Sequence, residues 1–209
     1  MEQETQENPI RRFWNWLKGD SFGSWIVSLI LAFVIVKYIF FPTLSFLLAT
    51  SLPLVVVESA SMHHPAAQGV AGVGAAIGIS DFQKWWDEKG SWYTGHSISE
   101  QEVQSWPFEN GLEKGDIMVV SGRGKTPEIG DVIIFNAGQA HPIIHRIVNI
   151  ENINGNVIYS TKGDNNDEQL SIEREIPKDT LVGKAVFRIP KLGWVKLIFV
   201  NLINAVKGN

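Results

Sequence analysis

Residues 21–57 read SFGSWIVSLILAFVIVKYIFFPTLSFLLATSLPLVVV, an apolar stretch whose only charged residue is Lys37. As one helix rising about 1.5 Å per residue, it would be much longer than the roughly 30 Å hydrocarbon core of a bilayer. Pro53 breaks a helix, and the β-branched residues within Leu54 to Val57 favour a strand. We therefore predict a transmembrane helix with its extension at residues 23–48, followed by the first strand of a β domain.

Basic residues precede the apolar stretch, namely Arg11, Arg12 and Lys18. Because basic residues concentrate on the cytoplasmic side of membrane proteins, we expect residues 1–22 in the cytoplasm and the chain after the span on the extracytoplasmic side of the cell membrane. A cleaved signal peptide has the same order of features, but its apolar core is typically about 7 to 15 residues long. A retained single-pass anchor is therefore favoured.

Composition excludes several kinds of function. The 209 residues carry a formal net charge of -4 with no long basic block, so we expect no binding of nucleic acid. The chain has no cysteine, which excludes thiolate nucleophiles, disulfides and cysteine-ligated zinc. No spacing of histidines and carboxylates is typical of a ligand set, so we expect no metal and no organic cofactor.

Residues 49–190 are predicted to form a mainly β domain, a small barrel or coiled sheet. Asn154 to Asn156 is typical of a tight hairpin turn. Short β-branched segments separated by glycine-containing turns predict the later strands. These segments are Ile117 to Val120, Val132 to Phe135, Ile143 to Ile150, Val157 to Ser160 and Leu181 to Ile189.

A small helical insertion is expected at residues 66–110. Its first part, up to Ser80, is rich in glycine and alanine and predicts a flexible loop. Capping boxes predict short helices from Asp81 to Lys89 and from Glu100 to Trp106. The aromatic residues of this region are interpreted either as the core of the insertion or as a patch that touches membrane or substrate. They are Trp85, Trp86, Trp92, Tyr93 and Trp106.

The C-terminal residues 191–209 are predicted to form an amphipathic helix. Lys196, Asn201 and Asn204 interrupt its apolar run, which is short for a membrane span. We expect this helix to lie at the membrane interface, with a second crossing as the alternative.

Ser61 is the candidate nucleophile, because it follows the apolar stretch and would leave the membrane at its surface. A serine hydroxyl needs a base, and an imidazole accepts a proton near neutral pH. His145 is the favoured base. His63 lies two residues from Ser61 and is interpreted as a pocket wall, and His141 is expected in a solvated loop.

Asp164 is the candidate acid that orients His145. Gly163 before it permits a tight turn, and the two asparagines after it can fix the loop by hydrogen bonds. A plain turn aspartate is the alternative. Ser59 is a tentative oxyanion donor together with the Ser61 amide, and a serine packed in a strand is its alternative.

Four segments in this order behind an anchor resemble the sequence boxes of the type I signal peptidases, in particular their archaeal and endoplasmic-reticulum branch. The segments are Ser59 to Met62, Gly130 to Phe135, Pro142 to Val148 and Thr161 to Asn166. Bacterial members have a lysine base immediately before an arginine, where this chain has His145. The resemblance therefore disfavours a serine–lysine mechanism.

The resemblance implies a membrane-anchored, signal-peptidase-like β catalytic domain in which Ser61 attacks, His145 is the base and Asp164 supports it. Exported preproteins would be cut after small residues at -1 and -3. The implied partners are signal peptides and the lipid bilayer, with the protein translocation channel as a further candidate, and the implied source is archaeal. Leu170 stands where the family often has a second aspartate, so Asp167 is a doubtful alternative acid.

An extended signal peptide could pair with an edge strand and present alternate side chains to one face, which would explain the -1 and -3 preference. Val55, Val57, Ile143 and Ile144 are the tentative residues of a small apolar substrate pocket.

Three other functions are considered. A self-cleaving serine–lysine hydrolase would need a lysine at the position of His145. A non-catalytic membrane-tethered β module, or an inactive subunit of a processing complex, would not need the three residues Ser61, His145 and Asp164. A structural adhesin would be expected to show repeats, and the sequence has none.

Overall fold

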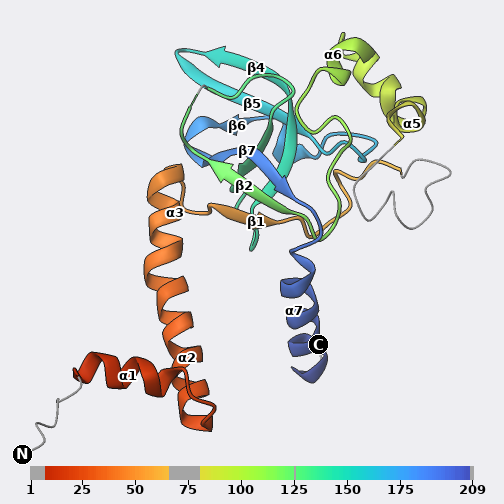
Figure 1. Cartoon of the computed structure of the whole chain (residues 1–209). Helices are drawn as coiled ribbons and strands as arrows, with labels where there is room; N and C mark the ends of the chain where they lie inside the picture. The colour runs from red at the N-terminus through yellow and green to blue at the C-terminus, as the bar shows by residue number, and fades with distance from the viewer. Residues whose placement is uncertain (1–7, 66–80, 125, 208–209) are drawn as a thin grey trace, which may run out of the picture. The chain divides into compact units, whose positions relative to one another are not determined.

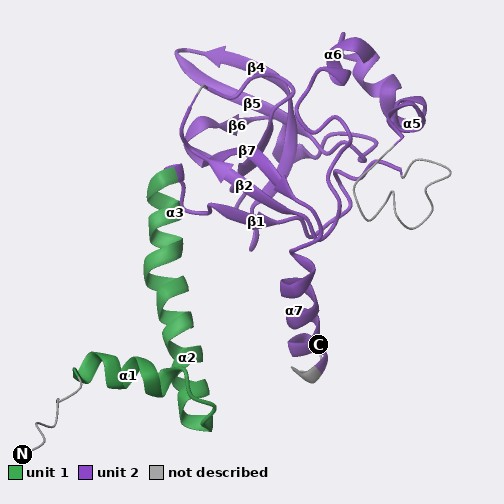
Figure 2. Cartoon of the chain, viewed as in Figure 1, with its two compact units in different colours: residues 1–47 green, residues 48–209 purple. Residues whose placement is uncertain are grey.

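The structure is a computed structural model that describes residues 8–65, 81–124 and 126–207. Residues 66–80, for which the sequence predicts a flexible loop, lie outside the described residues. The chain divides into two compact units, residues 1–47 and residues 48–209, which are coloured separately in Figure 2.

The first unit is helical. The side chain of Asn8 caps its first helix by accepting a hydrogen bond from the Ile10 amide, and Ser21 caps the second by accepting one from the Ser24 amide. The helices are α1 (Pro9–Leu17), α2 (Phe22–Ile35), the π-helical segment η1 (Val36–Phe40) and α3 (Phe41–Leu48), which ends in the second unit.

Pro42 does not end the long helix. Proline has no amide hydrogen to donate to the carbonyl four residues earlier, and the π-helical turn that precedes it adapts the backbone. In this turn the Phe41 amide donates to the Val36 carbonyl. The helix runs from Phe22 to Leu48, 27 residues that include an 18-residue window with a mean hydropathy of 2.3, and among the described residues it is the one helix long and apolar enough to cross a membrane.

The second unit is built on one antiparallel sheet, which confirms the mainly β prediction (Figure 1). Seven strands within the described ranges have the order β1-β2-β7-β3-β4-β5-β6. The strands are β1 (Leu54–Val56), β2 (Ile117–Ser121), β3 (Val132–Phe135), β4 (Ile143–Ile153), β5 (Asn156–Lys162), β6 (Ile176–Pro177) and β7 (Leu181–Ile189), and 3₁₀ turns η2 (Ser171–Glu173) and η3 (Lys178–Thr180) flank β6.

The hairpin between β4 and β5 forms where the sequence predicts it. Ile153 pairs with Asn156, so the turn consists of two residues. Asn154 and Gly155 have φ values of 54° and 85°, the left-handed backbone that such a turn requires and that asparagine and glycine tolerate best. This turn sets the register in which β5 returns alongside β4, so that Lys162 at the end of β5 pairs with Arg146.

Strand β3 lies at the centre of the core, because all four of its residues are buried. Its alternate side chains enter two separate apolar clusters, which we call the first and second core. The first core contains Val57, Met62, Leu112, Met118, Val120, Val132, Ile134, Val182 and Ala185, and the second contains Ile133, Phe135, Ile147, Tyr159 and Ile176. Strand β4 pairs with β3 from Ile143 to Arg146, so this part of β4 is fixed against the buried centre of the sheet.

The insertion contains helices α5 (Phe82–Gly95) and α6 (Glu100–Gln104). Ser99 caps α6, as the sequence predicts, whereas α5 is capped by Asp81, which the sequence placed inside that helix as its first residue. Helix α5 continues past the predicted end at Lys89 because Gly90 has no side chain, which leaves room for the indole of Trp86. The buried aromatic residues form a third cluster with Val148 of β4, so they are the core of the insertion; the cluster contains Trp85, Tyr93, Ile98, Val103, Trp106 and Val148.

The C-terminal helix α7 (Trp194–Lys207) begins where the Gly193 amide donates to the Gly115 carbonyl. Leu197 is buried, whereas Val195 and Phe199 are exposed. The interfacial position of this helix stays a prediction.

Candidate active site

Ser61 lies on a tight turn between two buried anchors. Val57 before it and Met62 after it both enter the first core. The Val57 amide donates to the Asp116 carbonyl, and the Met62 carbonyl accepts from the Leu112 amide at 2.7 Å. The turn is therefore fixed at both ends while the Ser61 side chain stays partly accessible.

The structure brings Ser61 and His145 together. His145 lies on β4 opposite Ile133 of β3, and its ring is almost fully buried. The Nε2 atom of His145 is 2.8 Å from the Oγ atom of Ser61. At this distance the hydroxyl can donate to an unprotonated Nε2, which is the geometry that general-base activation of a serine needs.

Glu173, which the sequence reasoning missed, occupies the other side of the imidazole. Its Oε1 atom pairs with Nδ1 of His145, and its carboxylate is fully buried. The Leu170 amide donates to its Oε2 atom at 2.7 Å, and the Thr161 hydroxyl donates to Oε1 at 3.3 Å. An acceptor at Nδ1 favours the tautomer whose Nε2 is free to accept a proton.

The structure does not bring Asp164 to His145, contrary to the expectation. The fully buried Asp164 carboxylate accepts from Arg146, with Nε to Oδ1 at 2.9 Å and Nη2 to Oδ2 at 2.7 Å, and its Oδ2 lies 3.2 Å from Nε2 of His64. Consecutive residues of a strand point to opposite faces, and Asp164 lies on the face of Arg146 rather than that of His145. Asp167 is not at His145 either, because it is exposed and pairs with Lys89 at 2.5 Å.

Arg146 is fully satisfied in its buried position. Its Nη1 donates to the carbonyls of Pro107 and Gly130 at 2.7 and 2.8 Å, and its Nη2 also donates to the Phe108 carbonyl at 3.0 Å. Together with the two bonds to Asp164, each of the five guanidinium N–H groups has an acceptor. A buried charge is tolerated under these conditions.

The loop at residues 163–166 holds the Ser61 turn. The Asn165 amide donates to the Ser61 carbonyl at 2.8 Å, and its side chain donates to the Ala60 carbonyl at 3.1 Å. A Cβ atom on Gly163 would lie 2.8 Å from both Nε2 of His145 and the Ser61 carbonyl oxygen. Only glycine allows this approach, so the loop that carries Asp164 also sets the position of the hydroxyl.

Ser59 lies beside the candidate nucleophile. Its Oγ atom is 3.0 Å from Oγ of Ser61 and 3.4 Å from the Ser61 amide nitrogen. The Ser61 amide thus donates to the Ser59 hydroxyl, which places the two groups side by side at the turn.

The four tentative pocket residues do not share one environment. Val57 is part of the first core, and Val55 and Ile144 pack against it. Ile143 packs against the second core, because it neighbours Ile144 in a strand and points the opposite way. The substrate pocket stays a prediction: Val55 and Ile144 share one half-buried environment, whereas Val57 is buried in the first core.

Two strand edges next to Ser61 have no neighbour among the described strands. Strand β1 pairs with β2 alone, and Ile143 to His145 pair with β3 alone because pairing of β4 with β5 begins at Arg146. An extended peptide can add to such an edge through main-chain hydrogen bonds.

Helix α5 braces the loop that holds Ser61. The indole of Trp85 donates to the Asp164 carbonyl at 3.1 Å, and that of Trp92 donates to Glu168 at 3.2 Å. The ammonium of the fully buried Lys162 lies 5.1 Å from the ring centroid of Trp92. The insertion is thus connected to the site through this loop.

The pKa values of three buried groups near the site are shifted from their ordinary values. Burial lowers the pKa of Lys162 to about 8. Burial alone would raise the pKa of Asp164, but Arg146 and His64 outweigh it and hold the pKa well below its usual range. Burial and the Asp164 charge raise the pKa of Tyr93. Asp164 is therefore an anion and Tyr93 is neutral at neutral pH.

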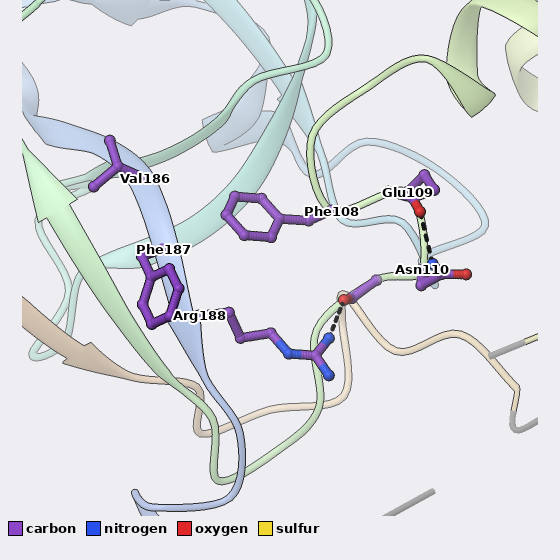
Figure 3. A pocket seen from close by; sticks show the side chains of 7 residues that line it. Phe108, Glu109, Asn110, Val186, Phe187 and Arg188 are labelled. Atoms are coloured by element: carbon purple, nitrogen blue, oxygen red, sulfur yellow. Dashed lines mark hydrogen bonds between the residues drawn. The ribbon is translucent and has the colours of Figure 1, made fainter. Parts of the chain in front are cut away.

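A separate pocket of about 340 Å³ lies between the segment 108–111 and β7 (Figure 3). Arg188 donates to the Gly111 carbonyl at its edge, at 2.9 Å. Its lining contains none of the predicted site residues; the lining residues are Phe108, Glu109, Asn110, Gly111, Val186, Phe187 and Arg188. Within the described part of the chain, no group of three or more histidines and carboxylates could hold a metal ion.

No protein-family model matches the chain. It is similar to the signal peptidase complex catalytic subunit SEC11 of Scheffersomyces stipitis, with 30% identity over 103 residues that cover 46% of this chain and 62% of that protein. The corresponding subunit SEC11C of Homo sapiens is 30% identical over 104 residues, 46% of this chain and 54% of the human protein. The chain thus spans less than two thirds of the length of these curated relatives.

The position of Asp164 predicts a structural effect. We expect Asp164→Asn to lower the free energy of unfolding by about 3 to 5 kcal/mol at neutral pH, because Arg146 would keep a buried charge without its counter-ion. Since the folded pKa of Asp164 is depressed, this stabilisation is complete well above the ordinary pKa of about 4 and is lost as the pH falls below it. Urea unfolding of the detergent-solubilised chain at several pH values measures it.

Asp167→Asn is the matched control, because Asp167 is exposed, and little change is expected from it. Equal unfolding curves for wild type and Asp164→Asn at neutral pH would contradict the structural role of the pair.

Proposed function

We propose that this chain, a distant homologue of the SEC11 catalytic subunits of the signal peptidase complex, is a membrane-anchored serine endopeptidase. It removes signal peptides from exported preproteins by cutting after small residues at -1 and -3. The observation that carries the proposal is the hydrogen-bonded series from the Ser61 hydroxyl through the His145 ring to the buried Glu173 carboxylate.

In the proposed mechanism, Ser61 Oγ attacks the scissile carbonyl as its proton passes to Nε2 of His145. Glu173 then stabilises the imidazolium, as the aspartate does in other serine proteases. The imidazolium returns the proton to the leaving amine, and a water activated by the same ring hydrolyses the acyl-enzyme. The Ser61 amide, which donates a weak hydrogen bond to the Ser59 hydroxyl in the structure, and the Ser59 hydroxyl itself are the donors proposed to turn to the oxyanion when substrate is bound.

The open edges beside Ser61 support an extended substrate. A peptide that pairs with β1 or with Ile143 to His145 presents every second side chain to the same face, which accounts for a joint preference at -1 and -3. Val55 and Ile144 are half-buried and pack against the core that contains the buried Val57, and these two side chains are the proposed apolar wall that suits alanine and excludes bulky residues.

The apolar helix from Phe22 to Leu48 supports a single-pass anchor. With the N-terminus in the cytoplasm, residues 49–190 act on the extracytoplasmic side of the cell membrane, where a signal peptide leaves the lipid. Residues 191–209 lie at the interface. The partners are therefore signal peptides of secretory preproteins and the lipid bilayer, together with the protein translocation channel.

Cleavage of a preprotein by the detergent-solubilised full chain tests the proposal. Wild type should release a mature protein with a new N-terminus after the small residue at -1, and Ser61→Ala and His145→Ala should reduce the rate by at least about 10³-fold, as in other catalytic triads. Ser91→Ala and His141→Ala are matched controls at exposed positions and should cleave normally. Equal cleavage by all the variants would remove Ser61 and His145 from the reaction, and no cleavage by wild type would favour a non-catalytic membrane-tethered module.

We expect the carboxylate of Glu173 to contribute to kcat. Glu173→Gln keeps the shape of the side chain but removes the charge that stabilises the imidazolium, so kcat should fall by roughly 10³- to 10⁴-fold with the fold retained. Glu175→Gln, an exposed neighbour, should retain wild-type kcat. Wild-type kcat in Glu173→Gln would remove Glu173 from the mechanism.

A further inference from the structure

Helix α1 is amphipathic in a way that the peptidase function does not use. At about 100° per residue, its apolar side chains fall on one half of the helix and its polar ones on the other. The apolar half carries Ile10, Phe13, Trp14, Trp16 and Leu17, and the polar half carries Arg11, Arg12 and Asn15.

The apolar half is uncovered. No residue of α1 is buried, and the exposed fractions are 65% for Ile10, 47% for Phe13, 50% for Trp14 and 45% for Trp16. A contiguous exposed face of this kind marks a surface that meets another apolar phase or partner.

The direction of α1 is fixed relative to α2 within the first unit. Ser24 is fully buried, and its hydroxyl donates to the carbonyls of Gly19 at 2.5 Å and Ser21 at 2.8 Å. A Cβ atom on Gly23 would contact the indole of Trp16 at 3.5 Å. Helix α1 runs crosswise to α2 in Figure 1. The Gly23 contact places Trp16 of the apolar half next to the start of the long apolar helix.

We propose that α1 lies in the plane of the membrane surface at the start of the span and binds anionic lipid headgroups. Its aromatic side chains enter the boundary between headgroups and acyl chains, which tryptophan prefers. Arg11 and Arg12 face the headgroup phosphates, and α1 contains no acidic residue that would oppose them. The inference rests on the membrane span of the proposed function and not on peptidase activity.

The neighbouring sequence indicates that lipid covers the apolar half of α1. The long apolar helix that starts at Phe22 requires hydrocarbon around it, and four residues separate it from Leu17. A crosswise helix so close to the start of a span has the membrane surface beside it. The basic polar half matches the negative charge of that surface.

The depth of α1 can be measured because the chain has no cysteine. In the full chain, reconstituted in vesicles of phosphatidylcholine and phosphatidylglycerol, Phe13→Cys and Asn15→Cys each carry one environment-sensitive fluorophore. Iodide in the water should quench the label at position 15 several-fold more than the label at position 13. Equal quenching of the two labels would overturn the membrane-surface position.

The lipid class is tested with the label at position 15. A nitroxide on the headgroup of phosphatidylglycerol should quench it several-fold more than the same nitroxide on phosphatidylcholine at equal mole fraction. Arg11→Ala with Arg12→Ala should abolish the difference, whereas Arg11→Lys with Arg12→Lys should keep it, since both ammonium groups retain the charge. Equal quenching by both lipids in the otherwise unchanged chain would overturn the proposal.

Repeating both measurements in Ser61→Ala separates this inference from the peptidase. The lipid contacts should be unchanged in that variant, because Ser61 belongs to the other unit. A loss of the contacts in Ser61→Ala would overturn their independence of the site, and failure of the peptidase assay alone would leave the lipid result standing.

Discussion

The buried ion pair between Arg146 and Asp164 holds the second unit together around its site. Arg146 bonds the turn before β3 through Gly130 and the end of the insertion through Pro107 and Phe108. Asp164 belongs to the loop whose Asn165 holds the Ser61 turn. A buried ion pair is stable only when all of its hydrogen-bonding groups have partners. The Arg146–Asp164 pair therefore requires one arrangement of three segments that are distant in the sequence.

Strand β4 uses the alternation of its side chains to serve two purposes. His145 points towards Ser61 and Glu173, and the next residue, Arg146, points to the opposite face and its ion pair. The imidazole of His145 is therefore held on a strand that pairs directly with the buried strand β3. The insertion reinforces this from the other side, since Trp85 and Tyr93 both bond to Asp164.

The sequence predicted the apolar helix, the β domain and the meeting of Ser61 with His145, because these depend on local patterns and on boxes in a fixed order. It assigned the wrong neighbour to Asp164, since a carboxylate near the base in sequence need not share its face of the strand. Glu173 was missed because it lies on a 3₁₀ turn beyond the last box. The absence of a second aspartate at Leu170 was the signal that another acid had to be sought downstream.

The central claim is that Glu173 fixes His145 in the tautomer that can accept the Ser61 proton. Nitrogen NMR of the imidazole in the detergent-solubilised chain, above the pH at which the ring is protonated, tests it most directly. Nδ1 is expected to carry the hydrogen in wild type, and this preference is expected to weaken in Glu173→Gln. A ring protonated at Nε2, or a tautomer that does not respond to Glu173→Gln, would contradict it.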